Sequence, residues 1–128
     1  MPSGNTVKHQ NGGYSEIKNM EKVEYITCAA IWYKDLTTQR LLPKNIDKGI
    51  VVCGHRHGQC IDVVATLSEL RTVRFGPDSV GETEQGFMTS KNRFVDRMEA
   101  MGIAIKNKQV EKDNLHNPMI GLFSEDLY

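Results

Sequence analysis

The apolar residues of this chain fall in short runs, and this arrangement limits the folds that are open to it. Residues 23–33 (VEYITCAAIWY) and 49–53 (GIVVC) are rich in β-branched and aromatic side chains, a composition typical of strands. The polar connection 34–48 separates them. We predict that the second strand pairs antiparallel with the first, and that the small residues Ala29 and Ala30 mark a place of close packing.

Helical spacing begins after the second strand. In a helix predicted over residues 56–71, Cys60, Val64 and Leu67 lie on one stripe. Residues 72–86 contain three glycines and one proline, so we predict a loop there.

A second helix is predicted beyond a short extended piece at residues 87–89. Asp96 is the expected N-cap because Glu99 lies three residues further on, which is the spacing of a capping box. The helix should end near residues 106–108, where two lysines suit the negative end of the helix dipole. Three apolar residues line one face of this helix: Met98, Met101 and Ile105.

Together these elements predict an α+β fold, with a small N-terminal antiparallel β-sheet packed against two or more C-terminal α-helices. The length of 128 residues suits one domain. We assign residues 1–22, which are polar, to a flexible extension and residues 23–128 to a single α+β domain. The apolar closing stretch NPMIGLFSEDLY (117–128) is expected to dock across the domain.

Charge and cysteine content narrow the classes of protein further. The 16 basic and 16 acidic residues give a net charge of zero, so no general attraction to DNA, RNA or an anionic membrane is expected. No apolar run is long enough to span a bilayer, and the polar N-terminus does not have the pattern of a secretory signal. An odd count of three cysteines favours reduced thiols. We therefore expect a cytoplasmic protein.

The segment GHRHGQC (54–60), together with Cys53 before it, contains two cysteines and two histidines within eight residues. Such side chains can bind zinc, but structural zinc sites usually take ligand pairs from separated segments. Cys60 should face the core from the first turn of the helix, and we expect both cysteines to be ordinary buried thiols. We therefore predict no metal site.

The same segment can instead bind an anion, because a strand, a glycine and a helix start present free backbone N–H groups. Arg56 and His57 would add side-chain donors at that place. A Walker motif is absent. The alternative is a helix start whose Arg and His side chains are simply solvated.

The second candidate segment is QGFMTSKNRFVDR (85–97), which combines aromatic, amide and basic residues. An aromatic ring can stack on a base, an amide can contact a base edge, and Arg or Lys can hold phosphate. This mixture suits a nucleotide better than a nucleic acid polymer. Phe94 is expected in the core, whereas Phe87 could belong to the core or to a binding site. The candidate ligand-binding residues of this segment are Phe87, Met88, Thr89, Asn92, Arg93 and Arg97.

Known catalytic patterns find little support. The Gly-x-Ser-x-Gly elbow and the His-Glu-x-x-His helix are both absent. Cys53 and His55 or His57 form a nucleophile pair only if the fold brings them together. Three carboxylates gather in the predicted loop: Asp78, Glu82 and Glu84. We expect them to be solvated, with a magnesium site as the alternative, and we predict no catalytic residue and no cofactor.

Four stretches carry a family resemblance: AAI (29–31), VVCGHRHGQCI (51–61), QGFMTSKNRFVDRMEA (85–100) and LFSEDLY (122–128). Through them the chain resembles, over residues 25–128, the first type of Thoeris anti-defence proteins of bacteriophages. Proteins of that family act as sponges. They bind cyclic ADP-ribose isomers made by a bacterial TIR-domain immune enzyme and do not cleave them. Some members also hold a cyclic oligonucleotide at a separate site.

The resemblance implies an antiparallel sheet followed by helices, a homodimer or higher homo-oligomer, and the cytoplasm of a host bacterium. It also implies roles for candidate residues. Phe87 would stack on adenine. Asn92 and Arg93 would contact ribose or pyrophosphate. Arg56 and His57 would lie nearby.

The leading hypothesis is therefore a phage protein that binds and sequesters a cyclic ADP-ribose-type signal and so inhibits Thoeris immunity, without acting as an enzyme. Two alternatives stay open. A nucleotide-processing hydrolase using His55, His57 or a metal would convert the ligand into a linear product. A ligand-free inhibitor that binds a host factor would need an exposed apolar patch and no nucleotide pocket.

Overall fold

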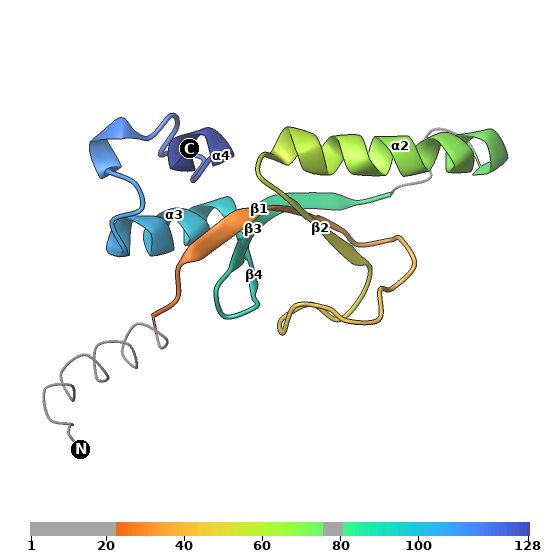
Figure 1. Ribbon diagram of the computed structural model, residues 1–128, viewed down its shortest axis with the longest axis horizontal. Coiled ribbons are helices and arrows are strands. Elements are labelled where there is room, and N and C mark those ends of the chain that lie inside the picture. The colour runs from red at the N-terminus through yellow and green to blue at the C-terminus, as the bar shows by residue number, and fades with distance from the viewer. Residues whose placement is uncertain (1–22, 76–80) are drawn as a thin grey trace, which may run out of the picture.

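The computed structural model describes residues 23–75 and 81–128, and its strands form a four-stranded antiparallel sheet in the order β2-β1-β3-β4 (Figure 1). The predicted antiparallel pairing of the first two strands is confirmed, with Ala30 opposite Cys53. The strands are β1 (Ile26–Tyr33), β2 (Ile50–Gly54), β3 (Thr83–Thr89) and β4 (Phe94–Asp96).

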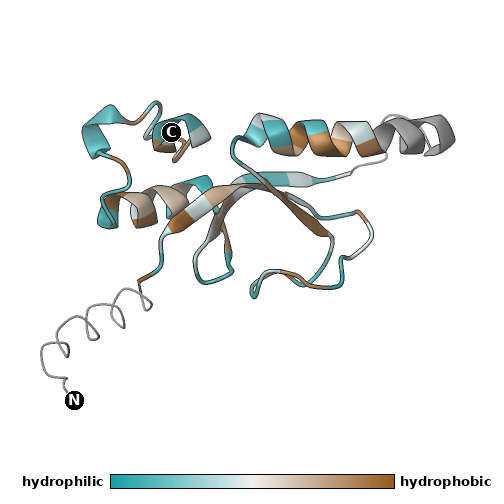
Figure 2. Cartoon of the chain, in the orientation of Figure 1, coloured by the Kyte–Doolittle hydropathy of each residue, from teal (hydrophilic) through white to brown (hydrophobic). Residues whose placement is uncertain are grey.

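Helices pack on the sheet, so the predicted α+β fold is confirmed. Figure 1 shows the long helix α2 and the shorter α3 at opposite ends of the sheet, with the C-terminal segment beside α3. In Figure 2 the hydrophobic colour lies on β2, on parts of β1 and on α3, whereas the start of β3 is hydrophilic, and the two colours alternate along the coloured part of α2. The helical elements are α2 (His57–Phe75), α3 (Arg97–Lys106), the 3-10 turn η1 (Lys112–Asn114) and α4 (Ser124–Leu127).

The central strand β1 is covered on both faces. Ala29 and Ile31 face the helices, where they join apolar clusters with residues of α3 and α2. Ala30 and Trp32 face the opposite way, toward the connection 34–49. A strand buried on both faces needs apolar residues at nearly every position, which explains the continuous apolar run in the sequence. Both alanines are fully buried, as the prediction of close packing requires.

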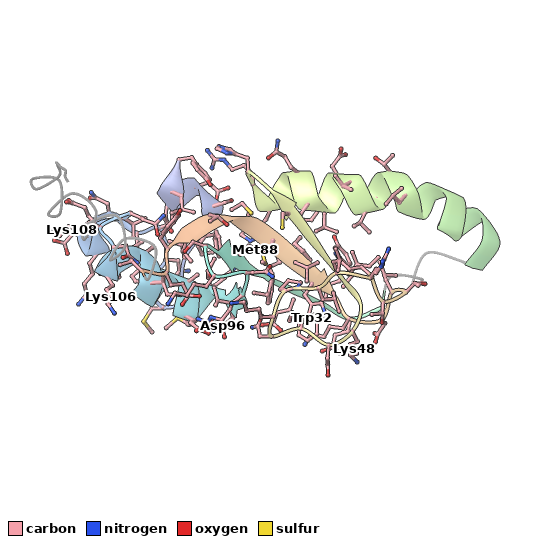
Figure 3. All side chains as sticks on the ribbon, turned by 60° about the horizontal axis from the view of Figure 1, so that its bottom comes forward. Trp32, Lys48, Met88, Asp96, Lys106 and Lys108 are labelled. Atoms are coloured by element: carbon pink, nitrogen blue, oxygen red, sulfur yellow. The ribbon has the colours of Figure 1, made fainter. Side chains whose placement is uncertain are left out.

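The connection 34–49 covers the sheet face that lies away from the helices. Ile46 packs there in a buried cluster with Met88 of β3. The indole N–H of Trp32 donates a hydrogen bond to the carbonyl oxygen of Lys48 at 2.9 Å, and both residues lie at the same end of the molecule (Figure 3).

The same connection supplies two side-chain amides to the outer strands. Asn45 accepts from the backbone N–H of Phe94 at 2.9 Å and donates to its carbonyl oxygen at 2.6 Å, on the outer side of β4. Gln39 accepts from the backbone N–H of Val51 at 3.0 Å, on the outer side of β2. These bonds fix the connection to both margins of the sheet.

Helix α2 is longer than predicted, because it continues to Phe75 where a loop was expected. Cys60 and Val64 are buried against the sheet as predicted, but Leu67 is 61% exposed. The far end of α2 runs past the strands (Figure 1), so the stripe loses its partner surface after two turns.

Helix α3 begins as predicted. The carboxylate of Asp96 accepts from the backbone N–H of Glu99 at 2.8 Å and caps the helix. The buried face is formed by Ala100 and Ala104, whereas Met98 is exposed. The predicted apolar stripe is therefore wrong at Met98, because the two alanines bring a neighbouring face of the helix close to the sheet. The other two residues of the predicted stripe, Met101 and Ile105, are half-buried.

The loop predicted over residues 72–86 is wrong at its end, because β3 already begins at Thr83. Strand β4 was not predicted. Both errors involve Gly86, because glycine is typical of turns but here allows β3 and β4 to approach each other closely. A Cβ there would lie 2.1 Å from the carbonyl oxygen of Val95, so only glycine lets β4 pair at this position.

The closing stretch docks across the body, as predicted. Leu122 is fully buried in the cluster beneath α3. The backbone N–H of Leu122 donates to the carbonyl oxygen of Arg97 at 2.9 Å. The guanidinium of Arg97 donates to the carbonyl oxygen of Leu122 at 2.7 Å. Gly121 (φ +126) is required beside them, because a Cβ would meet the backbone of Arg97 at 2.5 Å.

Candidate functional site

His57 joins the two segments that the sequence singled out. Its side chain is buried, and its Nε2 lies 2.7 Å from the carbonyl oxygen of Gly86. A carbonyl can only accept, so Nε2 carries the proton. The ring meets the Phe87 ring edge-on at 4.9 Å between centroids. Segments 54–60 and 85–97 are therefore in contact.

Burial lowers the pKa of His57, and the positive charge of Arg97 acts in the same direction. The hydrogen bond to Gly86 and the charge of Glu125 oppose this shift without cancelling it. His57 is thus a neutral structural group at physiological pH and does not supply the cationic donor that an anion site would use.

The chain's own C-terminal segment covers the predicted anion site at the start of α2. The guanidinium of Arg56 lies 3.9 Å from the carboxylate of Glu125 and 5.8 Å from the centre of the Tyr128 ring. The same tyrosine ring stacks on His55 at 3.7 Å between centroids. Arg56 is therefore engaged within the molecule, and a ligand at this place would compete with these contacts.

Phe87 is fully buried in the main core cluster, so neither face of its ring is open to a base. The prediction that it stacks on adenine does not fit this conformation. Met88 and Thr89 are buried as well, and the Thr89 hydroxyl donates to Glu24 at 2.6 Å. Phe94 lies in the core, as predicted. The middle of the second segment is thus sheet core.

Arg93 fastens the β3–β4 hairpin to the start of β1. Its guanidinium donates to both carboxylate oxygens of Glu24, at 2.8 and 2.9 Å, and to Glu99 at 2.9 Å. The hydrogen bond from Arg93 lowers the pKa of Glu24 to about 2, despite the burial that would raise it, and the Thr89 hydroxyl contributes to the lowering. The charge of Arg93 is compensated, so it is not a free phosphate ligand.

Arg97 has a similar structural role. Its guanidinium bonds to the side chain of Gln85 and lies over the Phe123 ring at 4.4 Å. Burial lowers its pKa, against the raising effect of the nearby carboxylates Glu125 and Asp126.

The hairpin tip, residues 90–92, is exposed. Asn92 adopts a left-handed backbone conformation (φ +60), which asparagine tolerates better than most residues. The backbone N–H of Asn92 donates to the carbonyl oxygen of Thr89 at 3.0 Å, and the backbone N–H of Lys44 donates to the carbonyl oxygen of Asn92 at 2.8 Å. This tight turn projects the Lys91 side chain to one side of the hairpin.

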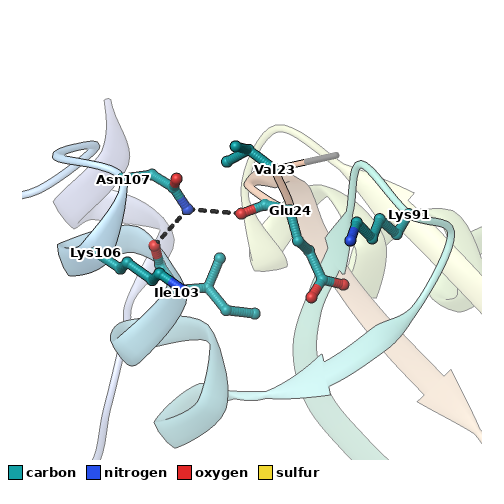
Figure 4. A pocket seen from close by; sticks show the side chains of 6 residues that line it. All are labelled: Val23, Glu24, Lys91, Ile103, Lys106 and Asn107. Atoms are coloured by element: carbon teal, nitrogen blue, oxygen red, sulfur yellow. Dashed lines mark hydrogen bonds between the residues drawn. The ribbon is translucent and has the colours of Figure 1, made fainter. Parts of the chain in front are cut away.

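A hollow of about 360 Å³ lies beside Lys91, and we call it the hairpin hollow (Figure 4). Its volume is within the range of roughly 300–1,000 Å³ that is usual for small-molecule sites. It lies between the start of β1, the hairpin tip and the end of α3. Its lining residues are Val23, Glu24, Lys91, Ile103, Lys106 and Asn107.

The hairpin hollow combines positive charge with hydrogen-bonding groups. Lys91 and Lys106 bring two ammonium groups to its rim, and the carboxylate of Glu24 is already bonded to Arg93. The side-chain NH₂ of Asn107 donates to the carbonyl oxygens of Glu24 at 2.6 Å and Ile103 at 2.8 Å (Figure 4). Within residues 23–75 and 81–128 no group donates to the side-chain carbonyl oxygen of Asn107, which can accept from a ligand hydroxyl.

A second hollow of about 330 Å³ shares Val23 and Asn107 with the first and adds Tyr25 and Gln109. The Tyr25 side chain is 46% exposed, while its backbone is fixed by two hydrogen bonds with Ser90, at 3.0 and 2.8 Å. An exposed ring on a fixed backbone is a suitable stacking platform. The two adjoining hollows therefore place cations and an aromatic ring side by side.

The sequence patterns missed this site. Tyr25 was read only as part of a strand, and Lys106 only as a partner of the helix dipole. Asn107 was not singled out at all. The one sequence signal for this site is Tyr25 itself. It directly precedes the buried part of β1, at a strand end where an aromatic side chain can face solvent and contact a ligand.

A third hollow, of about 230 Å³, lies on the sheet face covered by the connection and is lined in part by Met88, Asn92 and Cys53. Cys53 is exposed, contrary to the prediction of two buried cysteines, whereas Cys60 is buried as expected. The register places Cys53 on the face of Ala30, away from His57, so these two residues do not form the hypothetical nucleophile pair.

Two of the three carboxylates that the sequence grouped in a loop lie among the described residues. Glu82 and Glu84 both lie close to the ammonium group of Lys34, at 3.5 and 3.2 Å, while Asp78 lies outside the described residues. Among the side chains described, those of residues 23–67 and 81–128, no three of His, Cys, Asp or Glu come together as metal ligands would.

Comparison with known families places the chain among phage proteins. The model of the phage T4 y16D protein family matches residues 25–128. The chain belongs to the phage T4 y16D protein family. The matched span is the one that carried the resemblance in the sequence. It contains the whole described sheet and the residues that line the two hollows beside Asn107, apart from Val23 and Glu24. No curated protein and no solved structure matches the chain. Among the described helices of this y16D-family protein, none has the length and apolar character needed to cross a membrane.

Proposed function

We propose that this y16D-family protein binds and sequesters a cyclic ADP-ribose-type immune signal, and that the hairpin hollow and the adjoining Tyr25 form its binding site. The observation that carries the proposal is the pair of hollows that share Asn107, with Lys91 and Lys106 around one and an exposed aromatic ring in the other. A ligand with a pyrophosphate and an adenine needs both kinds of group side by side. The resemblance to Thoeris anti-defence proteins supports this choice of ligand.

The groups around the two hollows can supply specific binding energy. Each lysine can form a charge-assisted hydrogen bond to phosphate, of about 1.5–3 kcal/mol. Stacking of adenine on Tyr25 would add about 1–3 kcal/mol. The carbonyl oxygen of Asn107 can accept from a ribose hydroxyl.

We propose binding without cleavage because the site offers weak acid–base chemistry. Glu24 is the carboxylate among the six residues lining the hairpin hollow, and two hydrogen bonds tie it to Arg93. With a pKa of about 2 it stays ionised at neutral pH, so it is a poor proton donor and a weak base. Such a site favours holding a nucleotide over hydrolysing it.

A homodimer or larger homo-oligomer is part of the proposal, and it rests on the resemblance. Exposed apolar side chains such as Met98, Met119 and Ile120 are available for contacts between copies. Light scattering coupled to gel filtration tests this point. A monomer at micromolar concentration would contradict it without affecting the ligand proposal.

The direct test is to incubate the protein with individual cyclic ADP-ribose isomers, remove free ligand by gel filtration, denature the protein by heat and identify the released nucleotide by mass spectrometry. We expect at least one isomer to be recovered intact in near-stoichiometric amount. A linear product would instead establish a hydrolase. Absence of any bound nucleotide would overturn the proposal.

Matched variants locate the site. The double substitution Lys91→Ala with Lys106→Ala should weaken binding by at least about 100-fold, since two charge-assisted bonds are lost. Tyr25→Ala should weaken it by roughly 10- to 100-fold. Lys112→Ala, on the exposed turn η1, is the control and should leave the affinity unchanged. If the double variant loses the nucleotide but still blocks Thoeris immunity in bacteria, a ligand-free interaction with a host factor accounts for the inhibition.

A further inference from the structure

Two cysteines lie next to each other on the sheet face that the connection 34–49 covers. The register pairs Cys53 of β2 with Ala30 of β1, so Cys28, two residues before Ala30, is the diagonal neighbour of Cys53 on the same face. Cys53 is exposed and Cys28 is half-buried, whereas Cys60 is fully buried on the opposite face. Solvent therefore reaches two neighbouring thiols but not the third.

The surroundings of this pair favour a reactive thiolate. The neighbouring thiol of Cys53 lowers the pKa of Cys28 to about 6, against burial, which raises it. The hydroxyl of Thr27 donates to the sulfur of Cys28 at 3.8 Å. The shared contact raises the pKa of Cys53, which keeps its proton. At neutral pH the pair thus contains one nucleophilic sulfur and one thiol.

We propose that Cys28 and Cys53 form a redox-sensitive pair that hydrogen peroxide converts reversibly into a disulfide between β1 and β2. The Cys28 thiolate attacks one peroxide oxygen, the O–O bond breaks, and a sulfenic acid and one water form with uptake of a proton. The Cys53 sulfur then attacks the sulfenic sulfur, its thiol proton goes to the departing oxygen, and a second water leaves as the S–S bond forms. Two electrons pass from the two sulfurs to the peroxide.

The geometry favours a reversible bond over a permanent one. Diagonal neighbours in a regular antiparallel pair have Cα atoms about 7–8 Å apart, whereas an unstrained disulfide spans about 4.4–6.8 Å. Bond formation therefore requires the edge strand β2 to move toward β1, and the strained bond is readily reduced. The movement would change the third hollow, because Cys53 is part of its wall.

Each cysteine lies in a different tryptic peptide, which makes the bond easy to map: residues 23–34, 49–56 and 57–71. The reduced protein is treated with hydrogen peroxide, remaining thiols are blocked with N-ethylmaleimide in denaturant, and the protein is digested without reductant. We expect peptides 23–34 and 49–56 to appear as one linked species that separates on addition of dithiothreitol. Linkage through peptide 57–71, or absence of any link while peroxide is consumed, would overturn the proposal.

Two substitutions at one position separate the steps. Cys53→Ser keeps a hydrogen-bond donor beside Cys28 but removes the second sulfur, so a sulfenic acid should persist at Cys28 and be trapped by dimedone. Cys53→Ala removes the donor as well, and trapping at pH 7 should be slower by at least about tenfold because less thiolate is present. Cys60→Ser is the control and should leave both the link and the trapping rate unchanged. Equal trapping rates in the Ser and Ala variants would contradict the assigned role of Cys53.

Discussion

Replacing Glu24 by Gln tests how strongly the hairpin is fastened to the start of β1. The substitution keeps the shape of the side chain and removes the charge that Arg93 holds with two hydrogen bonds. The pKa of Glu24 falls from an ordinary 4.5 to about 2, and one pKa unit corresponds to about 1.36 kcal/mol, so the ceiling for this contact is about 3 kcal/mol. Because the Arg93 side chain is 33% exposed and solvent screens the pair, we expect a loss of about 1–2 kcal/mol at pH 7.

The pH dependence gives this prediction its sign. A carboxyl group with a lowered pKa binds more protons in the unfolded chain between pH 4.5 and 2, so the stability it provides is fully present above this window and is lost as the pH falls through it. Urea unfolding of the wild type and Glu24→Gln at several pH values from 7 to 3 measures the difference. The gap between the two proteins should shrink steadily below pH 4.5.

The matched control is Glu99→Gln, which removes the other carboxylate bonded to Arg93. Half of the Glu99 side chain is exposed, so its loss should cost only about 0.5 kcal/mol. Equal losses in the two variants, or a gap for Glu24→Gln that does not change between pH 7 and 3, would refute the reasoning.

Three further perturbations probe the fold. Gly86→Ala places a Cβ 2.1 Å from a backbone oxygen of β4 and should cost about 3 kcal/mol in urea unfolding, whereas Gly102→Ala, in open space on α3, should gain about 0.5–1 kcal/mol. Leu122→Ala should cost about 2–5 kcal/mol because the side chain is fully buried, while Met119→Ala on the exposed part of the same segment should stay within about 0.5 kcal/mol of the wild type. The pKa of His57 is lowered by burial, so stability should fall as the pH drops below 6.5, and His57→Gln should show a smaller fall between pH 7 and 5.

Features with a local physical cause could be predicted from the sequence. The capping of α3 by Asp96 depends on residues three positions apart, and the pairing of β1 with β2 depends on two β-rich runs. The burial of Phe94 and the docking of Leu122 follow from apolar character alone. The α+β class was therefore accessible before the structure was known.

The candidate site could not be predicted in the same way, because its parts are distant in the chain. Tyr25, Lys91 and Lys106 come from the start of β1, a hairpin tip and the end of α3. The sequence left Phe87 open between the core and a binding site, and the resemblance implied stacking on adenine, but strand geometry turns its side chain into the core. Composition shows which groups a segment has, and the pairing of strands decides which of them face solvent.

The amides of Asn45 and Gln39 have a consequence for aggregation. An outer strand normally offers free backbone groups to which a strand of another molecule can add, and repeated addition builds fibrils. Asn45 occupies both backbone groups of Phe94 on β4, and Gln39 occupies the N–H of Val51 on β2. A foreign strand would have to displace these amides before it could bond there. One connection thus protects both margins of the sheet against templated growth, and copies that assemble would meet through helices or loops.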